Sequence, residues 1–258
     1  MNSRFTHNRH FDAVLFDLGN TLIYFDGDWS KVLPQADAAL TSCLQAAGLV
    51  FDPESFLNEF QKREKAYFAE RETEYIEYTT AFILRKLLND WGYPEIPDTL
   101  ITGALEAHYR VSQTHWKPEA DAIPTLLSLH QKGYRLAIVS NAGDDADVQT
   151  LVDKAQIRSY FDLILSSAKA GIRKPNPRIF SDVLDKLEVP PGRAVMVGDT
   201  LSADILGAQN AGIFSVWITR RADQIANGVH IDTIHPGAVI TTLRELPDLL
   251  ENCMHPGE

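Results

Sequence analysis

The sequence predicts an α/β fold, a doubly wound parallel sheet with an all-helical domain inserted after its first strand. Residues 12–18 form a short apolar run that ends in a carboxylate and a glycine, which is typical of a buried parallel strand entering a turn. Between residues 29 and 115 the apolar side chains recur at helical spacing. After Pro118 the predicted helices and strands alternate, which is the pattern of an open α/β sheet.

Short apolar runs predict the remaining strands of the sheet. These runs cover residues 136–139, 161–165, 195–197, 214–218 and 238–240. A helix that contains Ile179, Val183 and Leu187 lies between two of them and ends before Pro190. Together with the first strand, these elements make up the doubly wound sheet.

The helical segment has recognisable starts and stops. Asp52 and Pro53 open a helix as an N-cap residue followed by proline at the first helical position. A second helix covers residues 78–91 and ends at Gly92, and a third opens at Pro97. We therefore divide the chain into an N-terminal tail (1–10), a discontinuous α/β core (11–28 and 116–258) and a helical domain (29–115).

The composition is that of an ordinary soluble globular protein. Of 258 residues, 45% are hydrophobic and 23% are charged, so the chain can bury a sizeable core. The formal net charge of −11 at pH 7 repels a phosphate backbone, and we expect no binding to nucleic acid. A small phosphorylated ligand is not excluded, because a metal ion and one lysine can reverse the field inside a pocket.

The sequence predicts a cytoplasmic protein with no membrane partner. No run approaches the roughly 18 apolar residues that a membrane-spanning helix needs, and the N-terminus lacks the apolar stretch of a signal peptide. Cys43 and Cys253 are far apart and lack the spacing of metal ligands, so we expect two reduced thiols. Nothing in the sequence indicates an oligomeric state.

Polar side chains follow the predicted strands at the points where the strands end. Asp17 follows the first strand, Ser140 and Asn141 the next, and Asp199 a later one, while Lys174 lies in a proline-restrained loop. Ligands of doubly wound sheets bind at the carboxyl ends of the strands. Taken singly, each residue could be a turn, cap or solvated side chain. Acids, hydrogen-bonding groups and a cation on one edge together suit phosphoryl transfer.

Four motifs in order give the chain a family resemblance. They are FDLGNTL around Asp17, IVSN ending at Asn141, GIRKPNPRIF around Lys174, and VGDTLSADILGAQNAG with Asp199 and Asp204. The chain resembles the haloacid dehalogenase superfamily, subfamily I, in which a helical cap is inserted after the first strand of a Rossmann-like core. The resemblance extends from Phe11 to about Ile218.

The resemblance implies a magnesium-dependent phosphatase that hydrolyses a small phosphorylated metabolite through an aspartyl phosphate. Asp17 would attack phosphorus and would also bind Mg²⁺. Asp199 and the backbone carbonyl of Gly19 would bind the same ion, which accepts oxygen ligands of this kind. Asp204 would be a further ligand or an acceptor for metal-bound water.

The resemblance also implies which groups bind the phosphoryl group. Ser140 would donate a hydrogen bond to a phosphoryl oxygen, with the Asn141 amide beside it. Lys174 would offset the charge of the phosphoryl group and of the clustered carboxylates. The helical cap would screen the site and select the substrate.

Gly19 departs from the phosphatase pattern. Phosphatases of the family usually carry a second aspartate at this position, two residues after the nucleophile, as general acid and base. One interpretation is a phosphatase in which Asp26, Asp28 or a metal-bound water transfers the proton. The metal site is unaffected, because the ligand expected at this position is a backbone carbonyl.

Two other interpretations stay open. The first is a different reaction: dehalogenases of the family carry an aromatic residue at the position of Gly19, and phosphonate cleavage needs a lysine of the cap. The cap offers Lys62, Lys65 and Lys86. The second is a non-catalytic protein that binds a phosphate ester or a partner. The presence of a nucleophile argues against it, because binding alone does not need one.

Overall fold

The computed structural model describes residues 10–252, without the side chains of residues 71, 72 and 224. Apart from His10, the predicted N-terminal tail lies outside the described residues, as does Cys253. Cys43 is a free, half-buried thiol. Among the helices within residues 10–252, none has both the length and the apolar character that crossing a bilayer demands.

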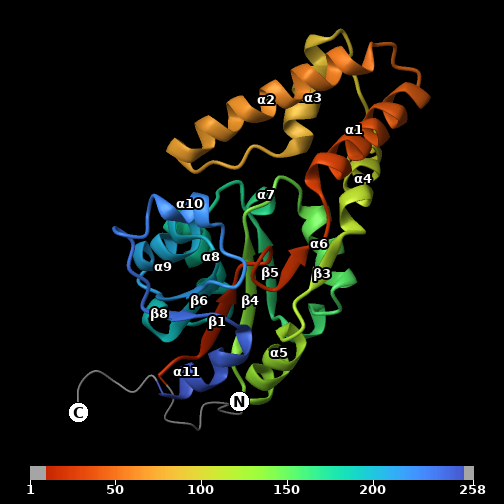
Figure 1. Ribbon diagram of the computed structural model, residues 1–258. Coiled ribbons are helices and arrows are strands. Elements are labelled where there is room, and N and C mark those ends of the chain that lie inside the picture. The colour runs from red at the N-terminus through yellow and green to blue at the C-terminus, as the bar shows by residue number, and fades with distance from the viewer. Residues whose placement is uncertain (1–9, 253–258) are drawn as a thin grey trace.

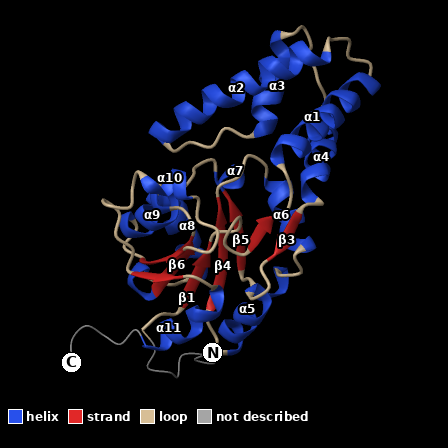
Figure 2. Ribbon diagram, in the orientation of Figure 1, coloured by secondary structure: helices blue, strands red, loops and turns tan. Residues whose placement is uncertain are grey.

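A six-stranded parallel sheet forms the centre of the part of the chain that the structure describes (Figure 2). Its strands are β1 (Ala13–Phe16), β4 (Arg135–Ser140), β5 (Leu163–Ser166), β6 (Ala194–Gly198), β7 (Phe214–Ile218) and β8 (Ala238–Ile240). Their order is β5-β4-β1-β6-β7-β8, and every neighbouring pair is parallel. The predicted doubly wound fold is therefore confirmed. Because β1 lies between β4 and β6, the segments that follow these three strands meet at one edge.

Helices cover both faces of this sheet. They are α5 (Ala122–Gln131), α6 (Asp145–Lys154), α7 (Ser167–Ala170), α8 (Pro177–Leu187), α9 (Leu206–Asn210), α10 (Gln224–Gly228) and α11 (Leu246–Asn252). Val14 and Phe16 of β1 pack in one core with α5, α6 and α11, whereas Ala13 and Leu15 pack in another with α8 and α9. This burial on both faces explains why the strand is a continuous apolar run and not an alternating one.

Strand β5 begins later than predicted. The apolar run that starts at Phe161 suggested a strand over residues 161–165, but a 3₁₀ turn at Arg158–Tyr160 ends with Phe161 as its C-cap. The Asp162 side chain then accepts a hydrogen bond from the backbone N–H of Leu136 at 2.9 Å. Phe161 is apolar because it packs against the core, and for this reason the sequence pattern placed the start of the strand too early.

The helical insert lies between β2 (Ile23–Phe25) and β3 (Trp116–Pro118) and contains α1 (Trp29–Ala46), α2 (Pro53–Glu74), α3 (Thr80–Asp90) and α4 (Asp98–Gln113). Figure 1 shows these helices as a group of their own at the top, set apart from the sheet and its flanking helices. They share an apolar core that includes Leu40, Phe56, Leu84 and Leu105. That residues 29–115 form a separate domain stays a prediction.

The predicted helix boundaries in the insert are close to those observed. Asp52 accepts a hydrogen bond from the backbone N–H of Ser55 at 2.8 Å, and α2 begins at Pro53. Helix α3 ends just before Gly92, whose φ of +92° suits a residue without a Cβ. The antiparallel pairing of β2 with β3, where the insert joins the core, was not predicted. Strands of three residues are too short to show an alternating pattern.

Candidate active site

A cavity of about 560 Å³ lies at the carboxyl edge of the sheet. It is lined by the seven residues that the sequence predicts to attack phosphorus, bind the metal or bind the phosphoryl group: Asp17, Gly19, Ser140, Asn141, Lys174, Asp199 and Asp204. Parallel pairing accounts for part of this convergence. Asp17 follows β1 and Asp199 follows β6, and these strands are neighbours. Ser140 ends β4, the neighbour of β1 on the other side.

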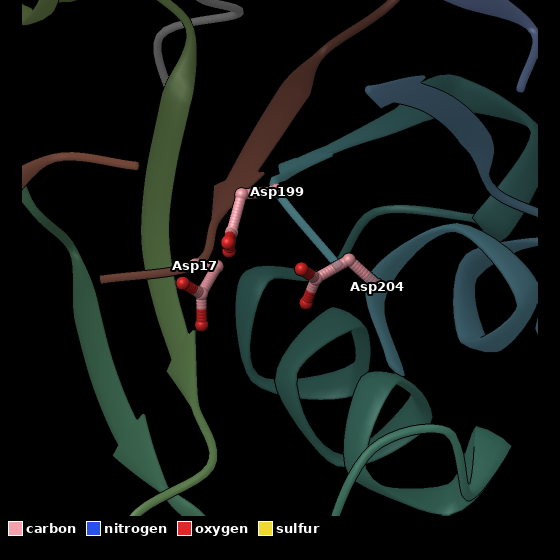
Figure 3. A group of neighbouring side chains, drawn as sticks. All are labelled: Asp17, Asp199 and Asp204. Atoms are coloured by element: carbon pink, nitrogen blue, oxygen red, sulfur yellow. The ribbon is translucent and has the colours of Figure 1, made fainter. Parts of the chain in front are cut away.

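Asp17, Asp199 and Asp204 form an acidic cluster. Each offers a carboxylate oxygen, and these oxygens all lie within 4.8 Å of one another. Figure 3 shows the three carboxylates turned toward a common space, with Asp17 and Asp199 at adjacent strand ends and Asp204 reaching in from the side. Asp204 belongs to a π-helical turn, Leu201–Ile205, that leads back over the end of β6.

The glycine that ends β6 makes room for Asp204. A Cβ atom at Gly198 would lie 2.3 Å from the Asp204 carboxylate carbon, so another side chain there would force the acid out of the cluster. The backbone N–H of Thr200 donates to the second oxygen of that carboxylate at 3.0 Å. The Gly-Asp-Thr segment therefore positions Asp204 as well as Asp199.

Lys174 supplies the positive charge of the site. Its ammonium lies 2.7 Å from a carboxylate oxygen of Asp17 and 2.7 Å from one of Asp204, and its side chain is 1% exposed. Burial by itself would lower the pKa of this lysine, but the two carboxylates raise it above its ordinary value. Lys174 is therefore a buried, charged ammonium in the wall of the cavity.

One lysine does not balance the acidic cluster. Burial raises the pKa of Asp17 to about 6; Lys174 opposes this shift and Asp204 adds to it. Burial, together with the neighbouring Asp17 and Asp204, raises the pKa of Asp199 to about 8. Buried carboxylates that repel one another are stabilised by a bound cation. Since the donors are all oxygen, the cluster fits a hard divalent cation such as Mg²⁺.

Asn141 holds the Lys174 loop. Its side-chain N–H donates to the carbonyl of Lys174 at 3.0 Å, and its side-chain oxygen accepts from the Lys174 backbone N–H at 2.9 Å. This two-point contact links the end of β4 to the loop before α8, a link that the sequence did not predict. A contact between Asn141 and the phosphoryl group stays a prediction.

The Asp199 loop is held by two donors from distant segments. The backbone carbonyl of Asp199 accepts from the indole N–H of Trp217 at 2.9 Å and from the side-chain amide of Asn227 at 3.0 Å. The carbonyl oxygen of the buried Asn227 side chain accepts from the backbone N–H of Leu201 at 2.7 Å. No local signal in the sequence marks Asn227 for this position.

The space beside Gly19 is partly filled by an aromatic ring. A Cβ atom at Gly19 would lie 3.6 Å from the nearest ring carbon of Trp116, which also lines the cavity. Trp116 is the first residue of β3, where the insert rejoins the core. In the structure it adjoins the position at which an acid is absent.

Asp26 and Asp28, the two side chains considered for the proton transfer, do not line the cavity, so that interpretation is not supported for either of them. The exposed carboxylate of Asp26 pairs with Lys117 of β3. Asp28 caps α1, where its carboxylate accepts from the backbone N–H of Ser30 at 3.0 Å. Both acids are thus engaged where the insert joins the core.

The cap lysines do not enter the cavity either. Lys62 is exposed and lies 3.5 Å from Glu59, Lys65 is exposed, and Lys86 donates to the hydroxyl of Tyr67 at 3.1 Å. A Schiff base with a substrate requires a lysine in the wall of the site. Among the residues of the insert whose side chains the structure describes, Tyr75 alone lines the cavity.

Tyr75 reaches the cavity because the linker between α2 and α3 docks on the core. The backbone N–H of Arg173 donates to the carbonyl of Tyr75 at 2.9 Å, and that of Glu77 donates to the carbonyl of Gly171 at 3.1 Å. The Glu77 carboxylate also accepts from the hydroxyl of Ser167 at 2.7 Å. The insert therefore contacts the loop that carries Lys174 as well as the β2–β3 connection.

Comparisons with known proteins agree with this geometry. A family model described as haloacid dehalogenase-like hydrolase matches residues 11–212. The chain is 31% identical to a glyceraldehyde 3-phosphate phosphatase of Methanopyrus kandleri over 92% of this chain and 96% of that protein. It is also 31% identical to a ribulose-1,5-bisphosphate 5-phosphatase of Halopiger xanaduensis, over 92% and 98%.

A solved structure extends the likeness to three dimensions. It is a 2-haloacid dehalogenase of Pseudomonas syringae pv. tomato DC3000, with a TM-score of 0.66 and 27% identity over 93% of this chain and 98% of that one. The family model covers both the strand before Asp17 and the segment that carries the other acids. The chain belongs to the haloacid dehalogenase-like hydrolases.

Proposed function

We propose that the protein is a magnesium-dependent phosphatase that hydrolyses a small phosphorylated metabolite, with Asp17 as the nucleophile. One observation carries this proposal: the Asp17 carboxylate lies in a single cavity with a buried ammonium and two further carboxylates. The names of the two relatives refer to phosphorylated sugars. A sugar phosphate is therefore the substrate class that we infer for this chain.

In the proposed reaction, the Asp17 carboxylate attacks phosphorus and the bond to the leaving oxygen breaks, giving an aspartyl phosphate that water then cleaves. With its pKa raised to about 6, Asp17 is mostly ionised at neutral pH and can act as a nucleophile. Lys174 stabilises the charge that spreads over the phosphoryl oxygens, and the Ser140 hydroxyl donates to one of them. The oxygens of the acidic cluster and of the Gly19 carbonyl would hold Mg²⁺, which supplies further charge neutralisation when bound.

The helical insert limits the substrate to small molecules. A cavity of about 560 Å³ is in the size range of pockets for metabolites. Tyr75 brings one side chain of the insert to its wall. We propose that residues 29–115 act as a cap that screens the reacting groups from water and contacts the leaving group through Tyr75.

Dehalogenation is the second candidate function. The dehalogenase structure and the Trp116 ring beside Gly19 favour it. Against it, displacement of a halide by a carboxylate develops no phosphoryl charge. A cavity with an acidic cluster that calls for a divalent cation is better suited to a phosphate ester.

The test is a panel of phosphomonoesters, including glyceraldehyde 3-phosphate and p-nitrophenyl phosphate, assayed with Mg²⁺ and with chelator. 2-Chloropropionate is assayed in parallel for chloride release. We expect phosphate release that needs the metal and is abolished by Asp17→Asn, which keeps the shape of the side chain and removes its nucleophilicity. Chloride release in place of phosphate release would overturn the proposal.

A further inference from the structure

The proposed phosphatase needs a proton donor that Gly19 does not provide. An alkoxide leaves phosphorus poorly unless it receives a proton as the bond breaks. Glycine carries no acidic group, and Asp26 and Asp28 lie outside the cavity. Since the carboxylates of the acidic cluster are assigned to attack and to metal binding, the remaining candidates are a metal-bound water and another group in the cavity wall.

Few titratable groups line the cavity apart from the acidic cluster and Lys174. Among the described lining residues they are Tyr75, Asp147, Arg173 and His230. Asp147 is the one carboxyl group in this set. It belongs to the first turn of α6, soon after Ser140 and Asn141, and Val148 and Leu151 of the same helix also line the cavity. This face of α6 is therefore a wall of the site, and Asp147 is its acidic member.

The surroundings of Asp147 leave one of its oxygens available. Oδ1 accepts a hydrogen bond from the side-chain amide of Gln113, on α4 of the insert, at 2.8 Å. Among the described residues Oδ2 has no hydrogen-bond partner, and Asp147 is one of the residues that line the cavity. A carboxyl group held at one oxygen and free at the other can give a proton to a bound molecule or accept one from it.

The charges around Asp147 favour a carboxyl that changes protonation near neutral pH. Burial raises its pKa to about 6; the amide of Gln113 opposes the shift, Asp144 adds to it and Lys154 lowers it. Asp147 also lines a smaller cavity of about 370 Å³, to which α4 contributes Glu106 and Arg110. A general acid works best when its pKa is close to the pH of the reaction.

We propose that Asp147 is the proton-transfer residue that replaces the acid absent at Gly19. In the first step the Asp17 oxygen bonds to phosphorus, the bond to the leaving oxygen breaks, and that oxygen takes the proton of Asp147. In the second step the oxygen of a water bonds to phosphorus, the bond between phosphorus and the Asp17 oxygen breaks, and the water gives a proton to Asp147. One water is consumed, and one alcohol and one phosphate are released.

The role of Asp147 rests on the proposed phosphatase activity. Asp147→Asn keeps the shape of the side chain and its contact with Gln113 but cannot give a proton. For glyceraldehyde 3-phosphate, an alkyl ester, we expect kcat to fall by about 10²–10⁴-fold. p-Nitrophenolate leaves without a proton, so the first turnover of p-nitrophenyl phosphate keeps its rate within about tenfold. A burst of nitrophenol should then precede a slow steady state, because the second step lacks its base.

Asp145→Asn is the matched control, since Asp145 is on the same helix, accepts from the hydroxyl of Ser166 at 2.7 Å and does not line the cavity. Tyr75→Phe and His230→Gln test the other lining groups. The proposal is overturned if Asp147→Asn keeps kcat for the alkyl ester, or if the first-turnover rate falls by the same factor for both esters. It is also overturned if Tyr75 or His230 shows the leaving-group dependence instead.

The proposed function has its own readout in the same experiment. Wild-type protein must release phosphate with Mg²⁺, and Asp17→Asn must not. If either of these two results is not obtained, both the phosphatase activity and the role of Asp147 are overturned. If both results are as expected but Asp147→Asn keeps the kcat of the wild type, only the role of Asp147 is overturned.

Discussion

The ammonium of Lys174 lies 2.7 Å from the carboxylate of Asp17, although 157 positions of the chain separate them. The same ammonium contacts Asp204, so one buried cation bridges two members of the acidic cluster. Such a contact orients the nucleophile and keeps it ionised in a site where burial favours its neutral form.

Lys174→Met should therefore lower kcat by about 10²–10³-fold, because it removes an electrostatic stabiliser from an enclosed site and keeps most of the side-chain volume. Lys62→Met, at an exposed position, should leave kcat unchanged. Thermal unfolding of both variants checks that the loss is catalytic. A loss of less than about twofold for Lys174→Met would contradict the assigned role.

The acidic cluster makes the stability of the metal-free protein depend on pH. The pKa values of Asp17 and Asp199 are raised to about 6 and about 8, so between pH 4 and 8 the folded state binds more protons than the unfolded state. Stability falls with rising pH wherever that holds. In chelator we expect the Tm to fall from pH 5 to pH 8. Mg²⁺ should raise the Tm more at pH 8 than at pH 5, because at pH 8 protons no longer compete with the ion for the carboxylates.

Asp199→Asn should weaken both effects, because it removes the carboxyl with the larger shift. Differential scanning calorimetry at pH 5, 6.5 and 8, with Mg²⁺ and with chelator, measures them. An equal gain from Mg²⁺ at pH 5 and at pH 8 would mean that the ion does not bind at the acidic cluster.

In the Asp147→Asn variant, which lacks the proposed acid, adding Gly19→Asp should restore little activity toward alkyl phosphates. The new side chain has room for its Cβ at 3.6 Å from Trp116, but the carboxylate beyond it must share the space beside the indole. The triple variant Asp147→Asn, Gly19→Asp and Trp116→Leu should regain more, up to the roughly 10²-fold that a positioned acid contributes. Steady-state kcat for glyceraldehyde 3-phosphate in Asp147→Asn and in the double and triple variants measures this. Full recovery in the double variant, with Trp116 in place, would show that Trp116 does not restrict the position.

Asn227→Leu should raise the Mg²⁺ concentration that gives half-maximal activity by about 10–100-fold, the usual effect of losing a group that orients a metal ligand. The variant deletes the donor to the Asp199 carbonyl and the acceptor for Leu201. Asn227→Asp keeps only the acceptor and should have a smaller effect. Titration of activity with Mg²⁺ measures both. An unchanged Mg²⁺ requirement would show that Trp217 alone holds the loop.

The sequence by itself determined the sheet, the helix starts and the residues at the strand ends. Residues 13–16 are buried on both faces and therefore had to be a continuous apolar run, and Asp52-Pro53 had to open a helix because its cap is made within three residues. That Asp17, Asp199 and Ser140 lie in one site was also predictable from the sequence. Each directly follows or ends a strand, and parallel strands finish at one edge.

Only the tertiary structure decided what stands around these residues. Trp116, Tyr75, Asp147 and Asn227 come from four separate segments, and no period or motif in the sequence relates them to Asp17. Local sequence sets local conformation, which is why helix and strand signals can be read from it. Contacts between distant side chains form only when the insert docks on the core and the loops pack, so they cannot be predicted from local sequence. For this reason the sequence suggested Asp26 for the site, whereas in the structure Trp116 is the residue that lines the cavity.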